Sequence, residues 1–223
     1  MSFKKNKKTY KNGLLEESLM LDVYLFVAPL GKPCMRSEKV MMEFVHNVDQ
    51  KVSFQIIPML NMQLVQDYLH SNDNQSYENY NALAEDMYHL ILDYKAALFQ
   101  CKRDGRTFLK LMQTELNQKG IVYSQSLGSE IARQAHLDLE MFEVDRRSQL
   151  AKDSFKADQQ TALEMNVTSS PSAVIFDDQA DECGILVENF SDDVLQQICQ
   201  DTDCPLSSSI SFTHPTISFP HVL

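Results

Sequence analysis

Residues 20–35 read MLDVYLFVAPLGKPCM and combine the signals of a strand, a loop and the start of a helix. The first eight residues are rich in apolar, β-branched and aromatic side chains, which predicts a buried central strand over 20–27. Pro29 and Gly31 then end the strand. Beyond Cys34 the apolar residues recur at helical spacing, which predicts a helix with a stripe of Val40, Met41, Phe44, Val45 and Val48.

The segments that follow complete a strand, helix and strand unit and then become helical. Residues 52–57 are apolar and are followed by Pro58, which predicts a second strand, parallel to the first, with a right-handed crossover. Helical spacing recurs from about residue 75 to residue 165, and no strand is convincing there. We expect several helices, with a break at Asp104-Gly105, a stop at Gly120, and N-caps at Ser124 or Ser126 and at Asp138.

The last third of the chain returns to strands. Residues 173–176 and 184–187 predict two antiparallel strands around a polar tip, and Ser191 precedes an acidic first turn that predicts a final helix. For the serine- and proline-containing end we expect a frayed tail, with addition to a sheet edge as the alternative. The predicted division is an N-terminal arm (1–18), an α/β domain (19–74 and 166–200), a helical insertion (75–165) and a C-terminal tail (201–223).

The composition describes an acidic protein with a substantial core. The 223 residues are 43% hydrophobic and carry a formal net charge of −11, which argues against binding to nucleic acid or to anionic membranes. We find neither a membrane span nor a secretory signal, so we expect a cytoplasmic protein. We interpret one basic cluster as a solvated arm rather than a docking site for an acidic partner; it comprises Lys4, Lys5, Lys7, Lys8 and Lys11.

The cysteines and histidines give no metal or disulfide signature. The five cysteines include no C-x-x-C pair, and the histidines share no ligand spacing with a carboxylate or a cysteine. We therefore expect reduced thiols, no metal and no cofactor. A dithiol redox centre is also excluded, because such a centre needs one thiolate to attack and a second to resolve the mixed disulfide.

The order of elements, together with two loops, resembles the DsbA-like branch of the thioredoxin superfamily. Residues 29–34, PLGKPC, resemble the P-x-C-x-x-C motif of that branch, and residues 167–171, VTSSP, resemble its cis-proline loop. The resemblance implies an α/β, thioredoxin-like fold with a helical insertion. It places Gly31 at the attacking cysteine, Cys34 at the second cysteine and Pro171 at the cis proline.

The insertion is similar to that of the YjbH/SpxH-type proteins. The similar stretches are AALFQ at 96–100, GRTFL at 105–109, LDLEMF at 137–142 and AKDSFKAD at 151–158. Those proteins act as adaptors that deliver the regulator Spx to the ClpXP protease. The resemblance therefore implies a cytoplasmic protein-binding module for regulated proteolysis in a stress response, with an Spx-like regulator and a protease chaperone as partners.

Two hypotheses on function follow. In the first, the chain is an adaptor whose binding surface comprises Gly31, Lys32, Pro33, Cys34, Ser170 and Pro171. In the second, it is an enzyme: a single-cysteine thiol-disulfide oxidoreductase with Cys34 as the catalytic thiol, or a glutathione-linked transferase or isomerase. A helix N-terminus lowers the pKa of a thiol, which would make Cys34 reactive, but we favour the alternative that Cys34 is a half-buried residue without a catalytic role. Gly31 offers no hydroxyl to activate glutathione, which disfavours the transferase.

Overall fold

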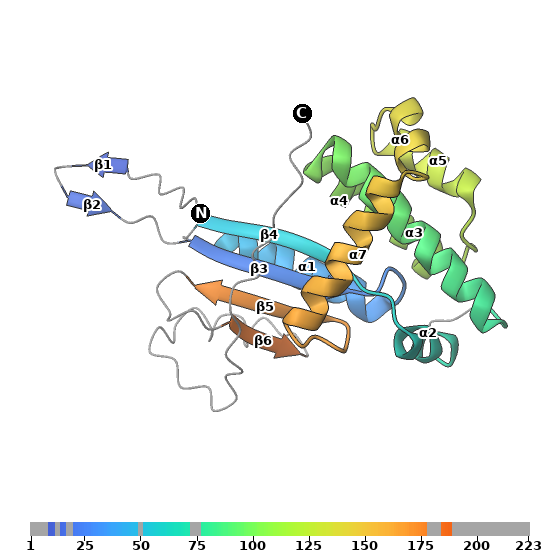
Figure 1. The fold of residues 1–223 in the computed structure, drawn as a ribbon, viewed down its shortest axis with the longest axis horizontal. Coiled ribbons are helices and arrows are strands. Elements are labelled where there is room, and N and C mark those ends of the chain that lie inside the picture. The colour runs from blue at the N-terminus through green and yellow to red at the C-terminus, as the bar shows by residue number, and fades with distance from the viewer. Residues whose placement is uncertain are drawn as a thin grey trace.

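The computed structural model of the chain describes residues 9–11, 14–16, 20–48, 51–71, 77–177 and 184–188. Its larger sheet has the strand order β4-β3-β5-β6 (Figure 1). The strands are β3 (Met20–Val27), β4 (Lys51–Pro58), β5 (Ser172–Asp177) and β6 (Gly184–Glu188). Strand β3 is parallel to β4 and antiparallel to β5, and β5 is antiparallel to β6. The predicted strands and the directions of their pairs are confirmed.

Strand β3 is central because its side chains are apolar on both faces. Val23, Leu25 and Phe26 are completely buried. Helix α1 (Lys32–Asn47) lies behind the sheet, and helix α7 (Gln149–Glu164) crosses its front (Figure 1). A sheet covered on both faces needs such a continuous apolar run, and the other interior strand, β5, has one too, since residues 173–176 are all buried.

Helices fill the region between β4 and β5. They are α2 (Met62–Leu69), α3 (Tyr80–Gln100), α4 (Lys102–Gln113), the π-helix η1 (Thr114–Gln118), α5 (Gln125–Gln134), α6 (Leu139–Asp145) and α7. The predicted N-caps are confirmed, since Ser124 accepts a hydrogen bond from Leu127 N–H and Asp138 accepts one from Met141 N–H. No described helix is long and apolar enough to span a membrane.

Two details of this helical region differ from the prediction. The short helix α2 was not expected. The break was expected at Asp104-Gly105, but α3 ends at Gln100, and Gly105 lies inside α4. A Cβ on Gly105 would come within 3.1 Å of the Leu98 backbone. This glycine therefore allows α3 and α4 to approach each other closely.

The ends of the chain are described only in part. Residues expected to form an N-terminal arm include a short antiparallel pair, β1 (Thr9–Lys11) and β2 (Leu14–Glu16), which the sequence reading missed. The helix predicted from Ser191 and the predicted tail at 201–223 lie outside the described residues.

A buried ion pair joins the helices of this region. Arg146 donates two hydrogen bonds to the carboxylate of Asp93, each 2.7 Å long, and both side chains are at least 96% buried. Tyr123 also donates to Asp93, at 2.8 Å. A Cβ on Gly128 would lie 2.7 Å from Arg146 Nη2, so the site requires a glycine there. The network links α3 to α5 and to the end of α6.

Replacing Arg146 by Ala is expected to lower the free energy of unfolding by about 3–5 kcal/mol, because Asp93 is left as an uncompensated buried charge. Arg147→Ala is the matched control, since the neighbouring Arg147 is exposed and forms only a surface pair with Glu143; its effect should stay within about 0.5 kcal/mol. Urea unfolding measures both. Equal losses in the two variants would show that the network contributes no special stability.

Candidate functional site

The loop after β3 carries the first part of the site. Gly31 caps α1 with φ 116° and ψ 131°, a conformation that other residues rarely adopt. Pro33 lies in the first turn of the helix, where its missing N–H costs no intrahelical hydrogen bond. Cys34 follows in the same turn and is only 3% exposed.

The loop before β5 carries the second part and meets the first. Pairing of β3 with β5 sets Ser172 opposite Phe26, so the loop before Ser172 lies beside the end of β3. Ser170 Oγ accepts a hydrogen bond of 2.6 Å from Ala28 N–H and lies 3.4 Å from Cys34 Sγ. The Ser170-Pro171 peptide bond is cis, as the resemblance implied. The expected meeting of the two loops is confirmed.

The six predicted binding residues differ in their exposure. Gly31 and Cys34 are buried, whereas Pro33 is exposed and Lys32, Ser170 and Pro171 are partly exposed. A protein partner docking on these loops would therefore meet Lys32, Pro33 and Pro171 and would scarcely touch the thiol.

The environment of Cys34 does not favour a reactive thiol. Burial raises the pKa of the Cys34 thiol, hydrogen bonds with Ser170 and with the Ala28 backbone oppose that effect, and Glu38 reinforces it. The net shift is upward, so less thiolate is present at neutral pH, and the thiolate is the nucleophile. Of the two sequence-based interpretations, the structure agrees with a buried Cys34 rather than with a thiol activated by the helix N-terminus.

The helical insertion holds the first loop through two polar side chains that the sequence analysis missed. Asn117 Oδ1 accepts a hydrogen bond of 2.9 Å from Gly31 N–H, and Gln113 Nε2 donates one of 2.6 Å to Glu38 Oε1. Gln113 and Asn117 are one helical turn apart and 1% and 2% exposed. Two polar residues among the apolar stripe of this helix were the available signal, because buried polar groups need partners.

Glu38 is a second titratable group close to the thiol. It lies in α1, one turn after Cys34, and is 9% exposed. Burial raises the pKa of its carboxyl to about 7, against the opposing effect of the hydrogen bond from Gln113. The loops and the insertion thus meet around a thiol and a carboxyl whose pKa values are both raised by burial.

The described residues form no metal site, and the other cysteines lie away from the two loops or outside the described residues. Within the described ranges, no group of three or more His, Cys, Asp and Glu side chains could hold a metal ion. Cys101 is exposed at the junction of α3 and α4, and Cys183, Cys199 and Cys204 lie outside the described residues.

Comparison with known proteins places the chain in a family. A family model described as thioredoxin matches residues 24–197, which include both loops of the site. The chain belongs to the thioredoxin family. This thioredoxin-family chain is also similar in structure to a putative protein disulfide isomerase from Nitrosomonas europaea (TM-score 0.60, 14% identity, 81% of this chain and 96% of that one) and to DsbA from Xylella fastidiosa (TM-score 0.57, 11% identity, 81% and 83%). These similarities establish the thioredoxin-like fold with its helical insertion.

The thioredoxin-family chain also has curated relatives with an adapter function. It is 28% identical over 168 residues to the ClpXP adapter protein SpxH of Staphylococcus saprophyticus and, over the same length, to that of Staphylococcus aureus. Each alignment covers 75% of this chain and 60% of the relative, so the chain spans about three fifths of the length of these proteins.

The two described cysteines should differ in their rates of alkylation. We expect iodoacetamide to modify Cys101 on the order of tenfold faster than Cys34 in the folded protein, because Cys34 is buried and its pKa is raised. Peptide mass spectrometry after timed quenching measures both rates in one sample, and the urea-unfolded protein is the control. Faster labelling of Cys34 would contradict the geometry.

The buried carboxyl should also give a pH-dependent stability. An ordinary Glu titrates near 4.5 in the unfolded chain, so between about pH 4.5 and 7 the folded state binds more protons. Its stabilising effect is therefore present at low pH and is lost as the pH rises. We expect this component to lower the free energy of unfolding by about 2–3 kcal/mol between pH 5 and 8.

Urea unfolding of the wild type and of Glu38→Gln at several pH values isolates that component. The variant should lack it, whereas Glu43→Gln, an exposed position on the same helix, should retain it. The same pH dependence in Glu38→Gln as in the wild type would exclude Glu38 as its source.

Proposed function

We propose that the chain is a protein-binding adaptor that presents an Spx-like regulator to the ClpXP protease. The observation that carries the proposal is the similarity to SpxH adapters together with a redox centre that has lost its first cysteine. A thioredoxin-like scaffold is retained, while the position of the attacking thiol holds Gly31. The chain therefore has the shape of such a site without a pair of cysteines for dithiol chemistry.

The contacts around the site support a binding role over a catalytic one. Ser170 and Asn117 occupy the N–H groups of Ala28 and Gly31, so these donors are not available to stabilise a reacting group. The remaining thiol is buried and has a raised pKa. What the site still offers is the outer surface of the two loops.

We assign partner contact to that outer surface. Pro33, Lys32 and Pro171 come from the two loops, and the bond between Ala28 and Ser170 holds the loops in register. Rigid, partly apolar loops lose little conformational entropy when a partner binds, which favours affinity. The enzyme alternatives need a thiolate at Cys34 or a group near Gly31 that activates glutathione. The raised pKa of Cys34 disfavours the thiolate, and Gly31 itself offers no hydroxyl.

A degradation assay tests the proposal. Purified ClpXP and the Spx regulator of the same organism are incubated with and without the chain, and the remaining Spx is followed by gel electrophoresis. The wild-type chain should accelerate the loss of Spx on the order of fivefold or more, and Cys34→Ser should retain this effect. The chain without an active protease serves as the control for direct proteolysis.

A parallel assay distinguishes the enzyme hypothesis from the adaptor hypothesis. Reduction of a disulfide substrate is followed with glutathione as the external thiol, for the wild type and for Cys34→Ser. We expect no turnover above background in either protein. Turnover by the wild type that Cys34→Ser lacks, with no effect on Spx degradation, would overturn the adaptor proposal in favour of a single-thiol enzyme.

A further inference from the structure

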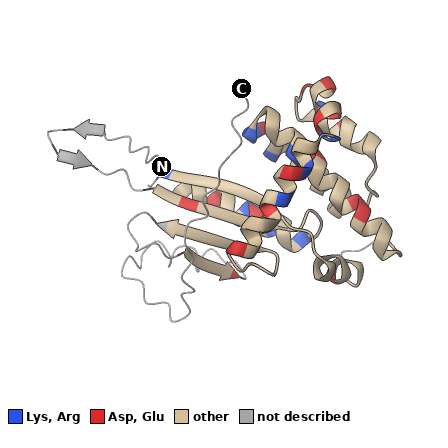
Figure 2. Ribbon diagram, viewed as in Figure 1, with Lys and Arg blue, Asp and Glu red and all other residues tan. Residues whose placement is uncertain are grey.

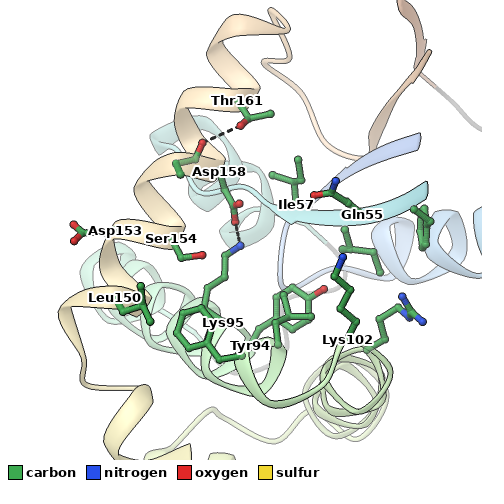
Figure 3. A pocket seen from close by; sticks show the side chains of 16 residues that line it. Gln55, Ile57, Tyr94, Lys95, Lys102, Leu150, Asp153, Ser154, Asp158 and Thr161 are labelled. Atoms are coloured by element: carbon green, nitrogen blue, oxygen red, sulfur yellow. Dashed lines mark hydrogen bonds and ion pairs between the residues drawn. The ribbon is translucent and has the colours of Figure 1, made fainter. Parts of the chain in front are cut away.

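A pocket at the outer edge of the sheet stands apart from the two loops. It has a volume of about 440 Å³ and lies between β4, α3, the start of α4 and α7 (Figure 3). Its lining includes Phe54, Gln55, Ile56 and Ile57, four consecutive residues of β4. Alternate residues of a strand face opposite sides of a sheet, so a pocket that contacts all four must meet the edge of the strand.

The direction of the backbone groups of β4 follows from two contacts. Met59 N–H donates to Val27 O, so residue 59 and the odd-numbered residues before it direct their N–H and C=O groups toward β3. Even-numbered residues direct theirs outward. Consistent with this, Pro58 O accepts a hydrogen bond from Gln159 Nε2 of α7, on the outer side.

Gln159 behaves there like one residue of an additional strand. Its side-chain amide donates to Pro58 O at 3.0 Å and accepts from Leu60 N–H at 3.4 Å. The next outward groups, on Ile56 and Phe54, border the pocket, and no described strand pairs with this edge. An unpaired edge of this kind is a template for an added strand.

The charges around the pocket set the character of its occupant. Lys95 is buried and forms an ion pair with Asp158, so both of these charges are neutralised. Lys102 and Arg106 also line the pocket, and neither forms an ion pair with a described carboxylate. The lining also includes the carboxylate of Asp153, which accepts a hydrogen bond from Gln149. In Figure 3, Lys102 extends from α4 toward β4. Two cations that form no ion pair within the described residues thus border an edge with which no described strand pairs.

The position of these cations in α4 adds to their effect. Lys102 and Arg103 lie in the first turn, where the helix dipole is positive and disfavours cations. Figure 2 shows Lys and Arg along α4, whose basic residues are Lys102, Arg103, Arg106 and Lys110. Arg103 pairs with Asp104, and Asp153 also lines the pocket, so the local excess of positive charge comes from Lys102 and Arg106.

We propose that the β4 edge binds an extended, acidic segment of a partner protein as an additional strand. The segment pairs with the outward groups of Phe54 and Ile56, its apolar side chains contact Leu98 and Leu150, and its carboxylate binds Lys102 and Arg106. The proposal deepens the adaptor function and rests on it in one respect, that the occupant is a protein.

Peptide selection identifies the chemistry of the occupant. A random library of 12-residue peptides is selected on the immobilised wild-type chain and counter-selected on the double variant Lys102→Glu/Arg106→Glu. We expect the enriched peptides to contain Asp or Glu with apolar residues at alternate positions. Enrichment of basic or uncharged peptides alone, or of none, would overturn the proposal.

The selected peptide with the highest affinity, labelled with fluorescein, is then used to test the pocket beside the β4 edge by fluorescence polarisation. The double variant should weaken binding at least tenfold, and Lys110→Glu should change it less than twofold, because Lys110 is exposed on the same helix outside the pocket lining. Equal loss of affinity in the double variant and in Lys110→Glu would show that only long-range charge matters, and would contradict a binding site at Lys102 and Arg106.

A backbone variant tests the strand pairing. Phe54→Pro removes an outward N–H without touching the bonds to β3, and Phe54→Ala removes the side chain alone. We expect the proline variant to bind at least tenfold more weakly than the alanine variant, with thermal unfolding confirming that both are folded. Hydrogen exchange at Ile56 should slow when the peptide binds to the wild type.

Two results would contradict the proposed addition of a strand at the β4 edge without bearing on the adaptor function. If sodium dodecanoate displaces the peptide and Ile56 exchange is unaffected by the peptide, the pocket holds small amphiphiles and the strand proposal is wrong. If the double variant accelerates Spx degradation as well as the wild type does, the proposed strand binding at the β4 edge is wrong and the adaptor function is unaffected. If the wild-type chain binds the peptide but does not accelerate Spx degradation, the adaptor proposal is wrong and the proposed binding site at the β4 edge is retained.

Discussion

The pairing of β3 on both of its edges is the constraint on which the rest of the structure depends. Strand β4 follows β3 closely in the sequence, whereas β5 follows after a helical region that extends from residue 62 to residue 164. Because β5 pairs with β3 in a fixed register, Ser170 reaches the N–H of Ala28 and the thiol of Cys34. The apolar side chains on both faces of β3 make this position favourable, since a central strand is covered by helices on both sides.

The same geometry explains how the loop that carries Gly31 and Cys34 is held in place. The first loop is held by side chains from two other parts of the chain, Ser170 before β5 and Asn117 in η1. Burial of Cys34 and Glu38 in this contact favours their uncharged forms and raises the pKa of each. A site built in this way maintains a shape, and a shape is what a binding protein requires.

The helical region contacts both the loop site at α1 and the outer edge of β4. On one side, Gln113 and Asn117 fix α1 and its loop. On the other, α3, α4 and α7 border the outer edge of β4, where Gln159 occupies the last outward groups and leaves those before them accessible. The buried pair of Asp93 and Arg146 connects the helices that define these positions. The two surfaces therefore belong to one framework.

The sequence by itself determined the order of the four strands of the larger sheet and their bounds to within one residue, the cap at Asp138 and, as one of two alternatives, the cap at Ser124, because these follow from local periodicity and capping chemistry. The meeting of the two loops followed from a resemblance in residues 29–34 and 167–171. The sequence could not determine the state of Cys34, since burial depends on what covers a side chain. The tertiary structure alone decided the roles of Gln113 and Asn117, the position of Gly105 inside a helix, and an edge of β4 with which no described strand pairs. Each of these depends on contacts between residues far apart in the chain, which no local pattern encodes.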